Sequence, residues 1–240
     1  MVAEQFVTPF WLDLAATGLG SVQGAMFAAQ FKDRRLDLLG VGLIGVVTGM
    51  GGGLLRDVLL NQVPAALETN WFIPIAIVAA LLGMLLERLL SRLNVTITVL
   101  DAVSLGLFCA IGASKALSLG LPVVPAVMIG IVAAVGGGML RDILLGMPIG
   151  VMHVGSLYAV AAGAGAVFLV GATASGSSIT VAGIGCVIVT TLIRLLAVRF
   201  GWSLPEQRTI STLRRLRWQR SAGRTGGRSA HHEHPDPESD

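Results

Sequence analysis

One short pattern occurs twice in this chain. Three glycines, two apolar residues and an Arg-Asp pair appear as GGGLLRD at 51–57 and as GGGMLRD at 136–142. Both copies lie inside long apolar segments. Consecutive glycines weaken a helix because glycine loses the most backbone entropy when it is ordered. Arginine and aspartate are costly inside a lipid bilayer. A chain that places both features in two apolar segments is therefore expected to build a polar site there.

The composition assigns these segments to a membrane protein. Hydrophobic residues make up 54% of the 240 residues, charged residues only 13%, and the mean hydropathy is +0.78. A soluble domain has about 25% charged residues. The 31 glycines agree with closely packed transmembrane helices. We predict an all-α polytopic membrane protein in which Cys109 and Cys186 are small residues of the helix core.

Seven apolar segments are long enough to cross the bilayer, whose hydrocarbon core of about 30 Å takes about 20 helical residues. They are 9–30, 36–60, 71–90, 97–119, 122–145, 151–171 and 178–198. This count places every lysine and arginine of the loops and tail on one side, and basic loops mark the cytoplasmic side. The prediction is a multi-pass protein of the cell (inner) membrane, with its N-terminus outside and its C-terminus in the cytoplasm.

The first six spans are expected to form a duplicated three-helix unit. Asp13 aligns with Asp101, Gly24 aligns with Gly112, and the two glycine motifs align with each other. Because each unit has an odd number of spans, the second copy enters the membrane from the opposite side, and the repeats are inverted. The predicted organisation is repeat 1 (8–95), repeat 2 (96–175), a seventh helix (176–200) and a basic cytoplasmic tail with a disordered end (201–240).

The glycine triplets allow two interpretations. Gly45, Gly49 and Gly53 form overlapping GxxxG steps, which are typical of close helix packing. A triplet also favours a kink or a short unwound segment, whose freed carbonyls must meet protein, water or a cation. We favour the second interpretation because the triplet occurs in both repeats. The candidate ion pathway then consists of six glycines: Gly51, Gly52, Gly53, Gly136, Gly137 and Gly138.

The charged residues of the spans are expected to meet. Neighbouring residues on a helix do not face each other, so Arg56 and Arg141 each need a partner other than the adjacent aspartate. Asp13, Asp101 and the aspartate of the opposite repeat are candidates. We predict one central polar network, made by Asp13, Arg56, Asp57, Asp101, Arg141 and Asp142. The alternative is a set of purely structural pairs that lock the repeats together.

Lys115 and Arg194 are two further basic residues of the spans whose roles need to be assigned. Lys115 has Phe27 as its counterpart in the first repeat, so it breaks the symmetry. It could act as a gate, hold a lipid headgroup or neutralise a carboxylate, or it could extend to the outer surface. Arg194, near the cytoplasmic end of the last span, is expected to extend to the membrane surface.

Together, the doubled glycine motif, the duplicated three-helix unit and the seventh helix resemble the prokaryotic members of the trimeric intracellular cation (TRIC) channel family. The resemblance covers about residues 8–198. It implies a homotrimer with one pore in each protomer, which conducts K⁺ and Na⁺ with a modest preference for K⁺. It also implies that the glycine triplets kink the second and fifth spans and line the pore with their carbonyls.

Other classes of function are weighed against this one. A secondary transporter of a small molecule such as glycine would use the same inverted repeats. A structural or lipid-binding membrane protein would not need a polar network in its spans. An enzyme is not expected, because the spans hold no Ser-His-Asp set and no set of metal ligands. Membrane lipids and two further copies of the chain are the expected partners, with no cofactor and no nucleic acid.

Overall fold

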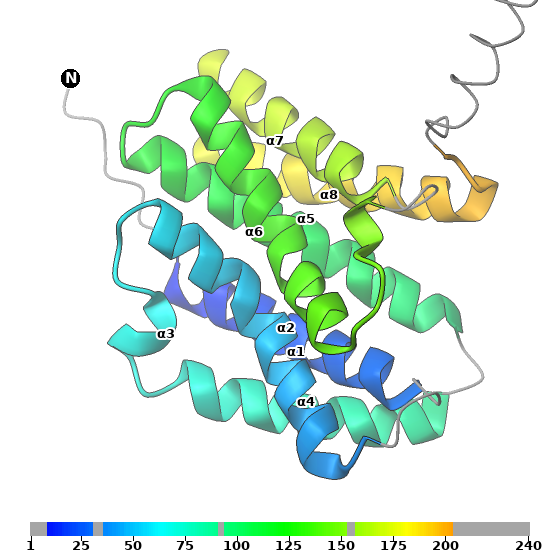
Figure 1. Ribbon diagram of the computed structural model, residues 1–240. Coiled ribbons are helices and arrows are strands. Elements are labelled where there is room, and N and C mark those ends of the chain that lie inside the picture. The colour runs from blue at the N-terminus through cyan, green and yellow to red at the C-terminus, as the bar shows by residue number, and fades with distance from the viewer. Residues whose placement is uncertain (1–8, 31–35, 91–93, 153–156, 204–240) are drawn as a thin grey trace, which may run out of the picture. The chain divides into compact units, whose positions relative to one another are not determined.

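The computed structural model describes residues 9–30, 36–90, 94–152 and 157–203, and in these residues all regular structure is helical (Figure 1). The long helices are α1 (Phe10–Gln30), α2 (Leu38–Leu59), α4 (Phe72–Leu90), α5 (Asn94–Ser118), α6 (Val123–Leu144), α7 (Tyr158–Ala174) and α8 (Ile179–Phe200). The short helix α3 (Ala65–Glu68) and the 3₁₀ turn η1 (Gly150–Met152) follow α2 and α6. Six long helices lie within three residues of the predicted bounds, whereas α7 begins at Tyr158, seven residues after the predicted start at 151. The tail beyond residue 203 lies outside the described residues.

By length and composition, four helices in the described part of the chain could cross a membrane: Leu38–Leu59, Val95–Ser118, Val123–Leu144 and Ile179–Phe200. Two shorter apolar helices accompany them, Phe72–Glu87 and Tyr158–Ala174. The structure therefore has the character of a multi-pass membrane protein. A count of seven crossings, and the direction in which the chain crosses, remain predictions.

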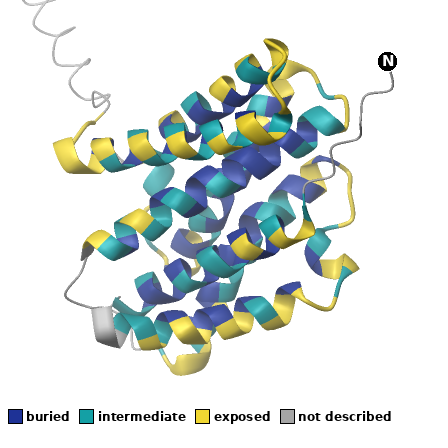
Figure 2. Cartoon of the chain, turned by 180° about the vertical axis from the view of Figure 1, so that it is seen from behind, coloured by how far each residue is buried: buried dark blue, intermediate teal, exposed yellow. Residues whose placement is uncertain are grey.

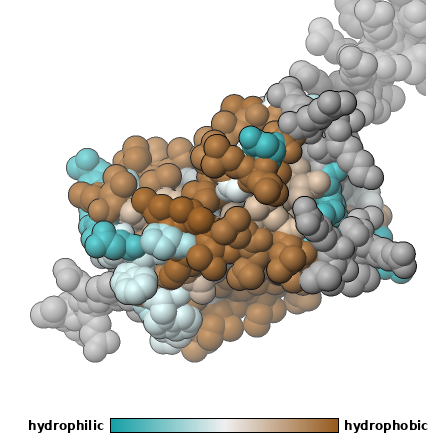
Figure 3. Space-filling model, turned by 90° about the horizontal axis from the view of Figure 1, so that it is seen from below, coloured by the Kyte–Doolittle hydropathy of each residue, from teal (hydrophilic) through white to brown (hydrophobic). Residues whose placement is uncertain are grey.

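Exposed residues lie on the outer faces of the helices (Figure 2), and the face of the molecule drawn in Figure 3 is largely apolar. On α8, Ile184, Ile188 and Leu192 repeat at the helical period and are more than half exposed. Patches of this extent are rare on soluble proteins. The outer surface is thus suited to lipid, and the polar side chains of the helices are directed inward.

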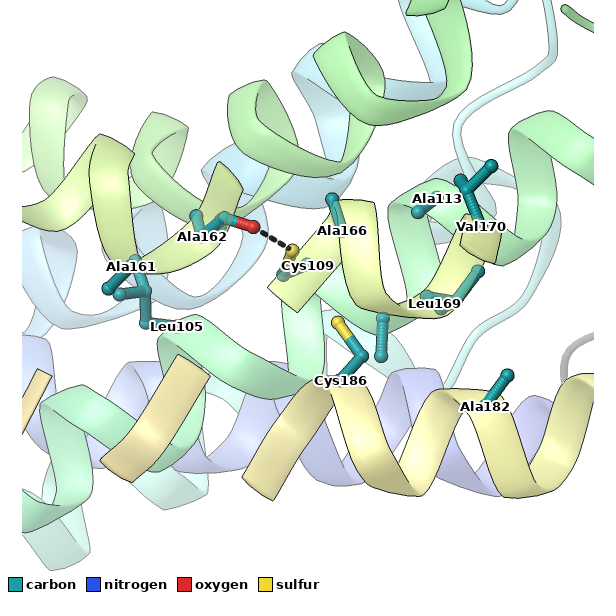
Figure 4. Packing of buried hydrophobic residues seen from close by; sticks show 12 residues of the cluster. Leu105, Cys109, Ala113, Ala161, Ala162, Ala166, Leu169, Val170, Ala182 and Cys186 are labelled. Carbon is teal, nitrogen blue, oxygen red and sulfur yellow. Dashed lines mark hydrogen bonds between the residues drawn. The ribbon is translucent and has the colours of Figure 1, made fainter. Parts of the chain in front are cut away.

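The packing between α5, α7 and α8 uses small residues. Cys109 and Cys186 are fully buried free thiols among Ala161, Ala162 and Ala166 (Figure 4). The Cys109 Sγ donates a hydrogen bond to the Ala162 carbonyl oxygen at 3.1 Å. The interpretation of the two cysteines as small core residues is confirmed. Small side chains let these helices approach closely, as van der Waals packing in a membrane requires.

The two glycine triplets meet where α2 packs against α6. A Cβ atom on Gly52 would collide with the carbonyl oxygen of Ala133, and one on Gly137 would collide with that of Thr48. The contact is reciprocal, because each triplet lies against the backbone of the other helix. Glycine is needed at these two positions for close approach. The GxxxG interpretation named other residues: Gly45 and Gly49 do contact α1 closely, but Gly53 has no close neighbour outside its helix.

Both triplets lie within continuous α-helix. The expectation of a short unwound segment at the triplets is therefore wrong. Close contact with the partner helix holds these residues helical, although three glycines in isolation would cost about 1 kcal/mol each relative to alanine. Their carbonyls consequently stay in the helical hydrogen-bond ladder. The kink expected in the second and fifth spans at the triplets stays a prediction.

The α2–α6 contact predicts opposite effects for two glycines of the same helix. Gly52→Ala should lower the thermal transition of the purified protein by several degrees, because its methyl group meets backbone that cannot move aside. Gly42→Ala is the matched control, since a Cβ there has nothing within 4 Å, and helix propensity predicts a slight increase. Equal transitions for the two variants, in fluorescence-monitored unfolding, would contradict the contact.

Candidate functional site

The charged residues of the helices form two separate clusters. The first cluster consists of Asp13, Arg56, Asp57 and Lys115. Its arginine and Asp57 come from the C-terminal part of α2, its other members from α1 and α5.

The second cluster consists of Asp101, Arg141, Asp142 and Arg194. Its arginine and aspartate pair comes from the same part of α6, and the other two residues come from α5 and α8. The predicted single central network is therefore wrong. The Arg-Asp pairs of the two motifs lie near the C-terminal ends of α2 and α6, a few residues beyond the glycines at which the helices make contact.

Arg56 is the centre of the first cluster and is only 1% exposed. Its Nη1 and Nη2 donate to the two carboxylate oxygens of Asp13 at 3.1 and 2.8 Å. Its Nε and Nη2 donate to the two oxygens of Asp57 at 2.7 and 3.0 Å. The Lys115 Nζ completes the cluster with a 2.8 Å contact to Asp57 Oδ1. Both carboxylates thus receive paired hydrogen bonds from one guanidinium, a strong and specific geometry.

The second cluster uses its arginine differently. The Arg141 Nε and Nη2 donate to Asp142 Oδ1 at 3.0 and 2.9 Å. The guanidinium carbon lies 3.9 Å from the centre of the Phe27 ring, a cation–π contact. Asp101, the counterpart of Asp13, accepts a hydrogen bond from Gln23 Nε2 at 3.2 Å and lies 3.6 Å from Arg194 Nη2.

The two motif aspartates also fix the loops that follow their helices. The backbone N–H of Ala65 donates to Asp57 Oδ2 at 3.0 Å. The N–H of Gly150 donates to Asp142 Oδ2 at 2.8 Å in the same way. In both motifs the aspartate therefore joins its arginine to the chain that leaves the helix.

These contacts correct one rule that the sequence analysis used. Arg56 and Arg141 do bind the aspartates next to them in sequence. A guanidinium reaches far enough to fold back along its own helix, so the rule that adjacent residues do not face each other fails for this long side chain.

The two remaining basic residues are also placed by the structure. Lys115 is 22% exposed at its side chain and pairs with Asp57, as the carboxylate-neutralising alternative predicted. The expectation for Arg194 is wrong: it is buried in the second cluster and does not extend to the membrane surface. Arg194 lies in the last helix, outside the duplicated unit, so the comparison of the two repeats could not indicate its partner.

Each cluster borders a small cavity. The cavity beside the first cluster has a volume of about 10 Å³ and is lined by Gly53. The cavity beside the second cluster has a volume of about 40 Å³ and is lined by Gly138. By volume they hold roughly one and roughly three waters. They share no lining residue and are two separate cavities.

The charges within each cluster balance, with two acids and two bases. A buried charge needs such partners because desolvation of a single ion costs several kcal/mol. Among the described residues, no three of His, Cys, Asp and Glu lie together as metal ligands would. The groups that could meet a monovalent cation are instead the oxygens lining the larger cavity, on Asp101, Ser104 and Thr48.

Comparison with known proteins agrees with this architecture. A family model described as "Glycine transporter" matches residues 10–88 and 98–174. The chain belongs to this family. The relative YadS of Escherichia coli K12, named a UPF0126 inner membrane protein, is 34% identical over 199 residues, which are 82% of this chain and 94% of YadS. The family member is thus a multi-pass membrane protein.

Solved structures of TRIC cation channels share the fold of this family member. One of these structures, described as the structural basis for conductance through TRIC cation channels, matches with a TM-score of 0.74 and 29% identity. The match covers 84% of this chain and 98% of that chain. The TRIC orthologue of Rhodobacter sphaeroides has a TM-score of 0.73 and 30% identity, with 80% and 97% covered. The resemblance to prokaryotic TRIC channels is confirmed. Because these neighbours are channels and YadS is a membrane protein, the prediction that the chain is not an enzyme is also confirmed.

The geometry of the first cluster predicts a specific charge exchange. Arg56→Asp alone should prevent recovery of monodisperse protein, because breaking a buried pair costs about 3–5 kcal/mol. Adding Asp13→Arg should restore part of the yield, since Asp13 is the residue whose two oxygens bind Arg56. Adding Asp101→Arg instead is the control and should restore nothing. Size-exclusion chromatography checks the yields, and equal recovery by the two second substitutions would contradict the assignment.

Proposed function

We propose that this protein is a K⁺-permeable monovalent cation channel with a pore inside each protomer of a homotrimer. The observation that carries the proposal is the fold, which matches TRIC cation channels over 84% of the chain. The two charged cavities on the path along α2 and α6 support it. K⁺ and Na⁺ would be the permeating ions, and membrane lipids would surround the trimer.

The proposed topology has seven spans, as two inverted three-helix repeats and a seventh helix, with the N-terminus outside. The equivalent roles of Asp57 and Asp142, each bound by the following loop, support the repeat. In this topology, the first cluster lies toward the outside and the second toward the cytoplasm. An ion would therefore meet one balanced cluster on each side of the glycine contact.

The proposed pathway runs from the smaller cavity past Gly53, across the α2–α6 contact, to Gly138 and the larger cavity. The third glycine of each triplet faces open space, since a Cβ there would meet only the neighbouring arginine, at 3.9 Å. In an unbroken helix these glycines contribute width, because they have no side chain. Conduction then requires α2 and α6 to separate, and we propose that the structure represents a closed channel.

A secondary transporter of glycine is the alternative, and the description of the family model favours it. Asp101 and Arg141 border the same cavity, so an amine and a carboxylate could each find an opposite charge there. Transport would then require this cavity to open to the two sides in turn.

Electrical recording separates the two functions. Purified protein in a planar bilayer under a K⁺ gradient should give discrete current steps that reverse near the K⁺ equilibrium potential, and glycine on one side should leave them unchanged. The absence of steps, together with saturable glycine uptake into liposomes, would reject the channel in favour of the transporter.

A substitution tests the pathway itself. Gly138→Leu should reduce single-channel conductance at least severalfold, because Gly138 lines the 40 Å³ cavity and a Cβ there meets no atom of the partner helix within 4 Å. Gly52→Leu and Gly137→Leu are less informative, since their Cβ atoms already meet backbone. Gly42→Leu, with open space at its Cβ, is the matched control. Unchanged conductance in a well-assembled Gly138→Leu protein would remove this glycine from the pathway.

A further inference from the structure

Arg194 occupies an unusual place in the second cluster. It belongs to α8, which lies beyond the residues that the family model matches. Its side chain is nevertheless 8% exposed and directed at Asp101 of α5. Its guanidinium carbon lies 3.6 Å from the centre of the Tyr158 ring, a close cation–π contact. A helix outside the duplicated unit thus supplies the fourth charge of this cluster.

Arg194 lies farther from its carboxylate than Arg56 lies from the counterpart, Asp13. Asp13 receives two short hydrogen bonds from Arg56, at 2.8 and 3.1 Å. The distance from Arg194 Nη2 to Asp101 Oδ2 is 3.6 Å, longer than the 2.7–2.9 Å of a good charge-assisted hydrogen bond. Gln23 and Tyr158 also hydrogen-bond to Asp101, so these neutral donors would stay with the carboxylate if another cation took the place of Arg194.

The same carboxylate borders the larger cavity. Gln23, Thr48 and Ser104 line this cavity with Asp101 and offer further oxygen atoms. The side chain of Asp101 is 16% exposed, so an ion in the cavity could reach it. The other charges here, Arg141 and Asp142, bind each other, and the positive charge of Arg141 also acts on Asp101.

We infer that Arg194 is a tethered cation that occupies Asp101 in place of a permeating monovalent cation. With Arg194 present, the acids and bases of the second cluster balance, so the cavity has little attraction for K⁺. When the guanidinium withdraws or is removed, one negative charge remains in a region of low dielectric constant, where its field is strong. The inference rests on the proposed function, since it names the residue that controls ion occupancy on the pathway.

The first test measures ion binding without any current. Rb⁺ serves as the probe for K⁺, in equilibrium binding to purified full-length protein in detergent. Arg194→Gln should bind Rb⁺ about tenfold more tightly than wild type, and adding Asp101→Asn should remove the gain. Arg199→Gln is the matched control, an exposed arginine of the same helix, and should leave binding unchanged. Equal Rb⁺ affinity in wild type and in folded Arg194→Gln would overturn the inference.

Two further variants decide the question if Arg194→Gln does not fold. Arg194→Lys keeps the charge with a more compact, point-like head group, so it should bind Rb⁺ with intermediate affinity. Tyr158→Phe keeps the arginine and the ring under it but removes the hydroxyl that hydrogen-bonds to Asp101, whereas Tyr158→Leu also removes the ring, so Tyr158→Leu should tighten Rb⁺ binding more than Tyr158→Phe does. Failure of Arg194→Lys to exceed wild type, and of Tyr158→Leu to exceed Tyr158→Phe, would refute the tethered cation.

Bilayer recordings of the same proteins separate this inference from the proposed function. Larger K⁺ currents in Arg194→Gln than in wild type would support both. Tighter Rb⁺ binding in a protein that carries no current would retain the tethered cation and reject the channel. Normal wild-type currents with no effect of any variant on Rb⁺ binding would retain the channel and reject the tethered cation.

Discussion

The structure depends on the burial of guanidinium groups beside carboxylates. Arg56 is almost completely enclosed, and a charge in this position is stable only while its partners stay in place. Its contacts join α1 to α2, and through Asp57 and Lys115 they extend to α5. One ion-pair cluster therefore fixes the relative positions of helices that lipid alone would not drive together, because apolar faces gain little from association in a bilayer.

The glycine contact between α2 and α6 works together with these clusters. Gly52 and Gly137 let the two backbones touch, which sets how closely the halves of the molecule approach. The third glycines, Gly53 and Gly138, have no such contact and instead line the cavities. In the second triplet, Gly137 both contacts the partner backbone and lines the larger cavity, whereas Gly138 only lines the cavity.

Much of the fold could be predicted from the sequence, since hydrophobic length located the long helices, and the repeated motif located the charged residues of the site. The sequence did not predict that the helices continue unbroken through the triplets, because close packing at Gly52 outweighs the low helix propensity of glycine. Arg56 pairs with Asp13 and not with Asp101 because of how the helices are positioned relative to each other, which the sequence alone does not specify. The burial of Arg194 depends on how α8 packs against α5, for which the sequence of α8 alone carries no pattern.

The loops after α2 and α6 are bound to the charges inside the protein. Ala65 and Gly150 each donate a backbone N–H to a buried aspartate. Withdrawal of such a donor would remove one hydrogen bond from a buried carboxylate, at about 1.5–3 kcal/mol for a bond to a charged group. A movement of either loop would therefore change the hydrogen bonding of the aspartate at the end of the preceding helix. A partner or lipid that binds such a loop could in this way change the electrostatic potential in the neighbouring cavity without entering it.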